Sequence, residues 1–119
     1  MTIARQIAEC LPVTVSGQET NDPMFAVFGE NTSWALSVAC PWTISGPGYE
    51  YRWDGETFEL AMARLVGAQL MSVEIGDDLI DPVFFFSGEL RLEVHADSDQ
   101  DPWVFRLPGM DFVLVGLAH

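Results

Sequence analysis

Short runs of alternating apolar and polar residues make up most of this chain, and glycine, proline or aspartate separates one run from the next. Two of the clearest runs are Trp34–Val38 and Leu90–Val94, where apolar side chains occupy every second position. A period of two residues predicts a β-strand with one buried face. Because only short turns separate the runs, we expect neighbouring strands to pair as antiparallel hairpins.

Two stretches follow the period of an amphipathic helix instead, with apolar side chains at positions i, i+4, i+7 and i+8. These side chains are Ile3, Ile7, Cys10 and Leu11 in the first stretch, and Phe58, Met62, Leu65 and Val66 in the second. Thr57 suits the N-cap of the second helix, and Gly67 suits its end. The pattern therefore predicts two short helices.

Each predicted helix is followed by five predicted strands. In the first half these are Leu11–Val15, Met24–Phe28, Trp34–Val38, a strand that begins at Pro41-Trp42, and Tyr49–Trp53. In the second half they are Leu70–Ile75, Val83–Phe86, Leu90–Val94, a strand that begins at Pro102-Trp103, and Asp111–Val115. Glycine-containing dipeptides between them, such as Gly29-Glu30 and Pro47-Gly48, predict turns.

The two halves also match residue by residue. A shift of 59 positions superimposes Ala4-Arg5 on Ala63-Arg64, Asp22-Pro23 on Asp81-Pro82, Phe25 on Phe84, and Gly29-Glu30 on Gly88-Glu89. With a small change of shift, Pro41-Trp42 falls on Pro102-Trp103. This agreement favours an internal duplication, with repeat 1 over about residues 3–53 and repeat 2 over about residues 58–116. The alternative is that two unrelated segments converged on the same hairpin pattern.

The expected fold class is α+β and rich in strands. Two tandem α-β-β-β-β-β repeats, with about ten strands and two short helices, form one pseudo-twofold domain over residues 1–119. The sheets are mostly antiparallel, and the helices cover one face or the open ends. We expect Trp42 and Trp103 to be equivalent core anchors. Arg5 and Arg64 are each expected to pair with a carboxylate of their own half.

The charge is strongly negative. The chain has 18 acidic residues, five arginines and no lysine, so its formal net charge is −13. Such a chain repels nucleic-acid phosphates and anionic lipid surfaces, and no apolar run approaches the roughly 20 residues of a membrane span. A basic protein is the partner that the charge favours, although acidity can also serve solubility alone.

Cys10 and Cys40 are the only cysteines, and no signal segment is visible at the start of the chain. A cytoplasmic location with both thiols reduced is therefore expected. The sequence predicts no catalytic residue, no cofactor site and no metal site. His95 and His119 lack metal-ligand spacing. Asp97, Asp99 and Asp101 alternate as calcium ligands do, but they lack the central glycine and the final glutamate of a calcium loop.

Residues that differ between the halves are the better candidates for function. The predicted interaction surface consists of two acidic clusters, one histidine and two tryptophans: Asp77, Asp78, Asp81, His95, Asp97, Asp99, Asp101, Trp34 and Trp53. An exposed tryptophan marks a binding surface. The two acidic clusters are expected to lie on one edge and form a negative patch.

The second half reads Leu65-Val66-Gly67, then Ser72-Val73, then Phe86, Gly88, Leu90, Leu92 and Val94, and finally Trp103. This pattern resembles a class of small, acidic bacterial domains of unknown function, some of them thought to be immunity proteins that neutralise toxins. The resemblance implies no catalytic residue. The net charge of −13 and the lack of a catalytic pattern, together with this resemblance, favour a cytosolic, non-enzymatic protein-binding domain of the immunity or inhibitor type. Two alternatives stay open, namely a structural or regulatory homodimer and a small-molecule-binding or enzymatic domain with a cleft between the repeats.

Overall fold

The computed structural model describes residues 3–75, 82–95, 103–108 and 114–115. The first half contains α1 (Ile3–Cys10), β1 (Val13–Thr14), β2 (Gly17–Asn21), β3 (Met24–Phe28), the 3-10 turn η1 (Glu30–Thr32), β4 (Ala35–Val38), β5 (Trp42–Gly46) and β6 (Tyr49–Arg52). The second half contains α2 (Phe58–Leu65), β7 (Gln69–Glu74), β8 (Val83–Phe86), the 3-10 turn η2 (Ser87–Glu89), β9 (Leu90–Val94), β10 (Trp103–Arg106) and β11 (Leu114–Val115).

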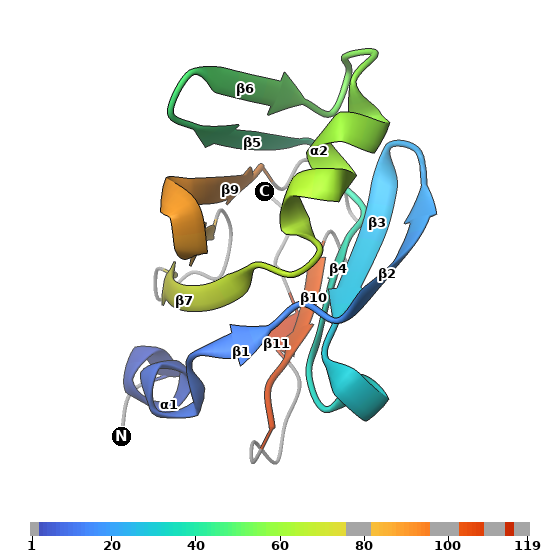
Figure 1. Ribbon diagram of the computed structural model, residues 1–119. Helices are drawn as coiled ribbons and strands as arrows, with labels where there is room; N and C mark the ends of the chain where they lie inside the picture. The colour runs from blue at the N-terminus through green and yellow to red at the C-terminus, as the bar shows by residue number, and fades with distance from the viewer. Residues whose placement is uncertain (1–2, 76–81, 96–102, 109–113, 116–119) are drawn as a thin grey trace.

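These strands form two antiparallel sheets (Figure 1). The six-stranded sheet has the order β1-β7-β8-β9-β5-β6, and the five-stranded sheet has the order β11-β10-β4-β3-β2. The prediction of a strand-rich α+β fold with antiparallel pairing is therefore confirmed. Strand β2 was not predicted, because its residues after Gly17 are all polar and it runs along an edge where nothing requires an apolar face.

Both sheets are assembled on the same plan. In the six-stranded sheet, β7-β8-β9 of the second half are followed by β5-β6 of the first half. In the five-stranded sheet, β2-β3-β4 of the first half are followed by β10-β11 of the second half. Each sheet therefore contains strands from both halves of the chain.

The registers match where the two halves meet. Trp42 begins β5 opposite Val94 of β9, and Trp103 begins β10 opposite Val38 of β4. Both indoles are fully buried, as expected for equivalent core anchors. Each tryptophan thus occupies the same place in its own sheet.

The shift of 59 residues is not kept through the fold, and Trp42 and Trp103 are themselves 61 positions apart. Helix α1 ends at residue 10 and α2 at residue 65, which is a shift of 55 positions. Phe25 lies opposite Val38, whereas Phe84 lies opposite Leu92, two residues away from the corresponding position. Gly29 has an extended backbone, whereas Gly88 has a φ of +75°. The elements correspond in order, but these matched residues do not occupy equivalent positions.

Val15 and Ser16 carry the chain from one sheet to the other. The Val15 N–H donates to the Ala68 carbonyl, and the Gly67 N–H donates to the Val15 carbonyl, each at 2.9 Å. The Ser16 N–H already donates to the Phe28 carbonyl of β3, also at 2.9 Å. Strands β1 and β2 are therefore two parts of one bent segment, and this segment joins the sheets at a corner.

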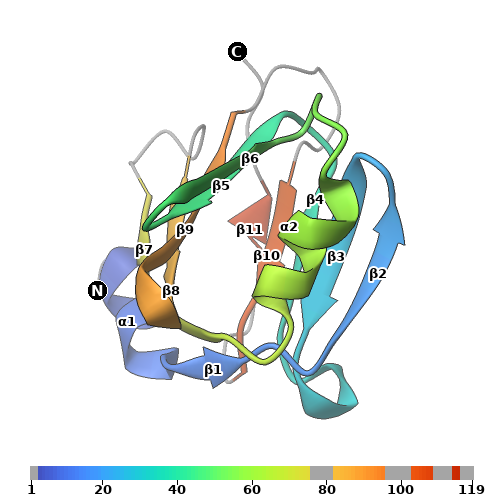
Figure 2. The ribbon, with the colours of Figure 1, turned by 45° about the horizontal axis from the view of Figure 1, so that its top comes forward.

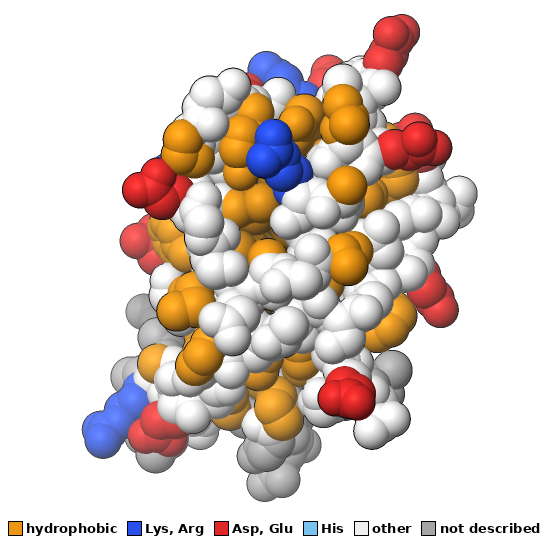
Figure 3. Space-filling model, in the orientation of Figure 1, with side chains coloured by type: hydrophobic (Ala, Val, Ile, Leu, Met, Phe, Trp, Pro, Cys, Tyr) orange, Lys and Arg blue, Asp and Glu red, His pale blue; other side chains and the backbone are white. Residues whose placement is uncertain are grey.

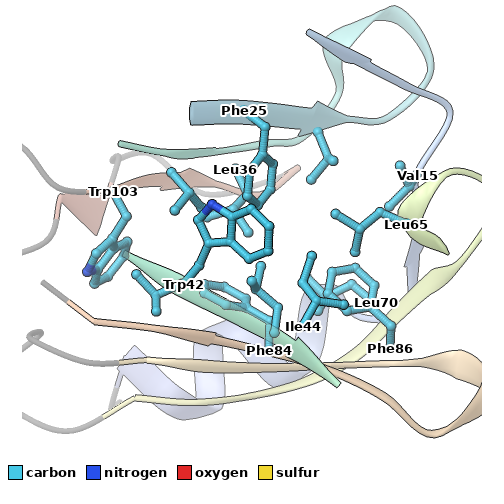
Figure 4. Close-up of a cluster of buried hydrophobic side chains, with 14 of the residues drawn as sticks. Val15, Phe25, Leu36, Trp42, Ile44, Leu65, Leu70, Phe84, Phe86 and Trp103 are labelled. Carbon is cyan, nitrogen blue, oxygen red and sulfur yellow. The ribbon is translucent and has the colours of Figure 1, made fainter. Parts of the chain in front are cut away.

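Apolar side chains fill the space between the sheets (Figure 4). The largest of those that are fully buried are Trp34, Trp42, Trp103, Phe84 and Phe105. The Phe84 ring meets the rings of Phe105 and Trp103 edge-on, with centroids 5.2 and 6.5 Å apart. Each large side chain contributes about 1.5–3 kcal/mol by its burial. Within the described residues no polar or charged side chain is buried.

The helices pack at opposite ends of this core (Figures 1 and 2). Helix α2 contacts β6 and buries Phe58, whose ring lies 6.3 Å from that of Trp42. Helix α1 contacts β7 and buries Ile7. Thr57 precedes α2 as predicted, although its hydroxyl makes no capping hydrogen bond. Gly67 follows α2 with a φ of +87°, so the predicted glycine stop is confirmed.

Candidate functional site

The outer faces of the two sheets differ in chemistry. On the six-stranded sheet, Arg91 and Glu93 form an ion pair of 2.8 Å between Nη2 and Oε1, and their cross-strand neighbours in β5 are Ser45 and Thr43. On the five-stranded sheet, the outward residues at the centre are small, because Ala26 of β3 lies opposite Ser37 of β4. The centre of this outer face is therefore flat and uncharged, with Glu19 of β2 opposite Ala26 on one side and Arg106 of β10 opposite Ala35 on the other.

Two adjoining hollows lie on this side of the molecule. The first, of about 280 Å³, is lined by residues of β2, β3 and β4 and the residue after β4, including Glu19, Ala26 and Ser37. The second, of about 300 Å³, is lined by Pro23, Met24, Ala39, Cys40, Pro41 and Trp53. Met24 and Ala39 line both hollows, so the two are continuous at these residues. We refer to this pair of hollows as the Met24–Trp53 surface.

Trp42 holds the two sides of the second hollow together. Its buried indole N–H donates to the Pro23 carbonyl at 2.8 Å, and its backbone carbonyl accepts from the Trp53 N–H at 3.0 Å. Pro23 and Trp53 both line the hollow. Because both bonds originate from a core residue, the hollow is held in shape without a ligand.

Large apolar side chains are exposed at this surface. Met24 is 42% exposed and Trp53 is 38% exposed, whereas Trp42 is completely buried. Methionine adapts to varied apolar partners, and tryptophan is enriched among the residues that contribute most to protein interfaces. These two side chains are therefore suited to contact another molecule.

The charges around the surface are negative. Glu19 lines the first hollow and is exposed, and Asp22 is exposed beside Pro23. Asp54 follows Trp53, but its Oδ1 lies 3.7 Å from Arg52 Nε, so this carboxylate is already paired with an arginine. Among the described residues, no arginine lines either hollow. Figure 3 shows one face with acidic side chains around its outline and apolar side chains exposed between them, together with basic side chains at the top, in the upper middle and at the lower left.

Two of the predicted surface residues lie at the same end of the molecule. Trp53 lines the second hollow, and the His95 N–H donates to the carbonyl of Pro41, another residue of that hollow, at 2.8 Å. The exposed His95 ring lies 3.4 Å from the Thr43 hydroxyl oxygen. Strand pairing explains this proximity, because Val94 lies opposite Trp42 and places the next residue beside Pro41.

Trp34 is a correction to the predicted surface. It is 1% exposed, and its indole N–H donates to the Thr14 carbonyl at 2.9 Å. Alternation along β4 points Leu36 and Val38 into the core, and Trp34 precedes them in the same phase. The other predicted surface residues, Asp77, Asp78, Asp81, Asp97, Asp99 and Asp101, lie outside the described residues.

Sequence reasoning missed Met24 and Ala39. An exposed methionine at the start of a strand has no distinctive sequence signal, because a buried methionine looks the same. The pattern of small outward residues, Ala26 and Ala35 with Ser37, was present in the sequence and would have indicated a flat outer face. Only the strand pairing shows that these small residues lie side by side on one face of the sheet.

The arginine predictions have a mixed outcome. Arg5 pairs with Glu9 one helical turn away, at 3.5 Å, so the predicted pairing within its own half is confirmed. For Arg64 the prediction was wrong, because its guanidinium carbon lies 4.0 Å from the centroid of the Tyr49 ring in the first half. The packing of α2 against β6 causes this contact, which is a cation–π interaction.

One of the alternative functions needs a cleft between the halves, and the junction is filled by apolar side chains. Trp42 and Phe84 from different halves lie in one continuous apolar core. Neither Cys10 nor Cys40 is in a disulfide. In the described part of the chain, no group of three or more His, Cys, Asp or Glu residues is placed to hold a metal ion. No helix in that part is both long and apolar enough to cross a membrane.

Comparisons with protein-family models, curated proteins and solved structures found no match to this chain.

Proposed function

We propose that this chain is a non-enzymatic protein-binding domain of the immunity or inhibitor type, and that it binds a basic partner in the cytoplasm. The observation that carries the proposal is the Met24–Trp53 surface, where two large exposed apolar side chains adjoin hollows bordered by carboxylates. An apolar centre with a charged rim is the usual composition of a protein interface.

The net charge supports a basic partner. At −13 the chain attracts cationic proteins over distances beyond direct contact, which raises their association rate. Three of the five arginines are already paired with carboxylates of this chain, namely Arg5, Arg52 and Arg91. Because the chain has 18 acidic residues and only five arginines, most of its carboxylates have no arginine to neutralise them and can attract a basic partner.

Two alternatives have less support. A small-molecule or enzymatic site between the halves would need a cavity where Trp42 and Phe84 now pack. A structural homodimer could use the outer edge of β2, which pairs with no other described strand. Two copies that each carry a charge of −13 would repel one another, so a basic partner is the better occupant.

We also propose that the fold arose by tandem duplication. The common plan of the two sheets and the matching registers of Trp42 and Trp103 support this origin. A pseudo-twofold relation would exchange β5 with β10 and β4 with β9. The differing shifts along the chain then reflect insertions and deletions after the duplication.

A cellular protection assay tests the function. The chain is co-expressed with any toxic protein encoded beside its gene, and growth is compared with and without the chain. Protection is expected, together with direct binding of the purified proteins that weakens as salt is raised. Absence of both protection and binding, at every salt concentration, would contradict the proposal.

A further inference from the structure

At the Met24–Trp53 surface, two large exposed apolar side chains line one hollow. Leu60, Val66 and Met71 are also exposed, but they line neither of these two hollows nor the one beside Arg91. A third hollow, beside Arg91 and Glu89, has charged residues in its wall. An apolar ligand group would therefore enter at Met24 and Trp53.

The size of the surface indicates what can occupy it. Each hollow measures about 280–300 Å³, which is at the lower end of the range for small-molecule pockets. The two hollows continue into each other past Met24 and Ala39. An elongated ligand that extends through both, such as a short segment of polypeptide, fits this shape better than one compact molecule.

The charges indicate what the segment carries. The second hollow is lined by apolar side chains and one thiol, so it suits an apolar side chain. Glu19 in the wall of the first hollow and Asp22 beside Pro23 are exposed carboxylates. A lysine or arginine would complement them, whereas an acidic segment would meet like charge at the first hollow, whose lining contains Glu19 and no arginine.

We propose that the Met24–Trp53 surface binds one short segment of a partner protein, with a large apolar side chain in the Trp53 hollow and a lysine or arginine beside Glu19. This inference rests on the proposed function and specifies its site and the chemistry of its partner. In binding of this kind, the affinity depends mainly on the buried apolar side chain. The association rate depends mainly on the attraction between the basic side chain and the carboxylates.

A peptide selection on the full-length chain tests the proposal. The probe is a random twelve-residue library displayed on phage, selected at low and at high salt. Selected peptides are expected to combine lysine or arginine with a phenylalanine, leucine, methionine or tryptophan. One of them, made synthetically, is then titrated into ¹⁵N-labelled protein. Shift changes are expected at Met24, Ala26, Ser37 and Ala39 and at the Trp53 indole.

Variants separate the anchor from the charge. Trp53→Ser is expected to weaken the synthetic peptide by about 30-fold or more, as truncation of an interface hot spot does. Glu19→Gln should weaken it several-fold at low salt and less at high salt. Leu60→Ser and Glu59→Gln on α2 are the matched apolar and charged controls, and neither should change affinity. If Trp53→Ser does not fold, Ser37→Arg tests the same surface, because its side chain would obstruct the first hollow.

Three results would overturn the inference. Selected peptides without basic residues would do so, as would basic peptides whose shift changes lie away from the Met24–Trp53 surface. A dimer in sedimentation that Trp53→Ser dissociates would show that a second copy occupies the surface. None of these results by itself contradicts the proposed function, which the protection assay tests separately. If the chain protects cells but does not bind at the Met24–Trp53 surface, the partner binds another face.

Discussion

At the scale of single residues, the four tryptophans have distinct roles. Trp42 is buried and connects the Pro23 turn to the backbone of Trp53 through its own indole and carbonyl. Trp53, the residue directly after β6, is exposed at the candidate surface. Stability should therefore depend on Trp42, and binding on Trp53.

Trp42→Phe is expected to lower the free energy of unfolding by about 3 kcal/mol. The shorter ring leaves a cavity, and the Pro23 carbonyl loses its donor. Urea unfolding followed by circular dichroism measures the loss. Trp53→Phe is the control and should stay within about 0.5 kcal/mol of the parent. Equal losses in both variants would mean that Trp42 is not the residue that anchors this end.

Gln18 is a second residue whose position affects stability. It lies in β2 opposite Val27, and its amide oxygen is buried without a hydrogen-bond partner among the described residues. Gln18→Met keeps the length of the side chain and removes the unpaired oxygen, so we expect the free energy of unfolding to rise by about 1 kcal/mol. Gln18→Glu should lower it, because a charge is buried instead. The same urea measurement applies, and a stability gain with glutamate would contradict this interpretation.

At the scale of elements, the β5–β6 hairpin depends on the conformation of one glycine. Gly46 pairs with Tyr49, and Gly48 between them has a φ of +78°, as the third position of a type II turn requires. An added Cβ at Gly48 would meet no atom within 4 Å. Any cost of substitution there therefore comes from the backbone alone. The hairpin also supports Tyr49, over which Arg64 of α2 lies.

Gly48→Ala is expected to lower the free energy of unfolding by about 1 kcal/mol, because alanine avoids a positive φ. Gly48→Asn should cost less, since asparagine tolerates this conformation. Thermal unfolding of the three proteins gives the ranking. The reverse order, with alanine the more stable variant, would rule out this turn type.

At the scale of the whole molecule, neither half contains a complete sheet. Strands β5-β6 complete the sheet of the second half, and β10-β11 complete the sheet of the first half. The core is shared in the same way, because Trp42 and Phe84 belong to one cluster. The two halves should therefore fold together or not at all.

Cutting the chain in the exposed loop after Gly55 tests this interdependence. Residues 1–55 and 56–119, expressed together with a tag on one, are expected to purify as a complex with the circular dichroism of the intact chain. Each half alone should lack a cooperative unfolding transition, because its sheet edges and core are uncovered. A half that folds alone as a monomer would refute the interdependence.

Local patterns determined much of the secondary structure. Strands such as β9, with Leu90, Leu92 and Val94 on one face, alternate clearly because one side faces the core and the other faces water. Helix α2 could be bounded by Thr57 and Gly67 for a similar local reason. The sequence of β2 does not alternate between apolar and polar residues, because at the exposed edge of the sheet its side chains do not need to be apolar.

The sequence alone determined the antiparallel α+β class, the core positions of Trp42 and Trp103 and the acidic character, because periodicity and charge are properties of short segments and of composition. Only the tertiary structure decided that strands are exchanged between the two halves, that Trp34 is buried while Trp53 is exposed, and that Met24, Ala39 and Trp53 line one hollow. These facts depend on which distant segments pair, and long-range pairing is selected by the fit of the whole core rather than by any one segment.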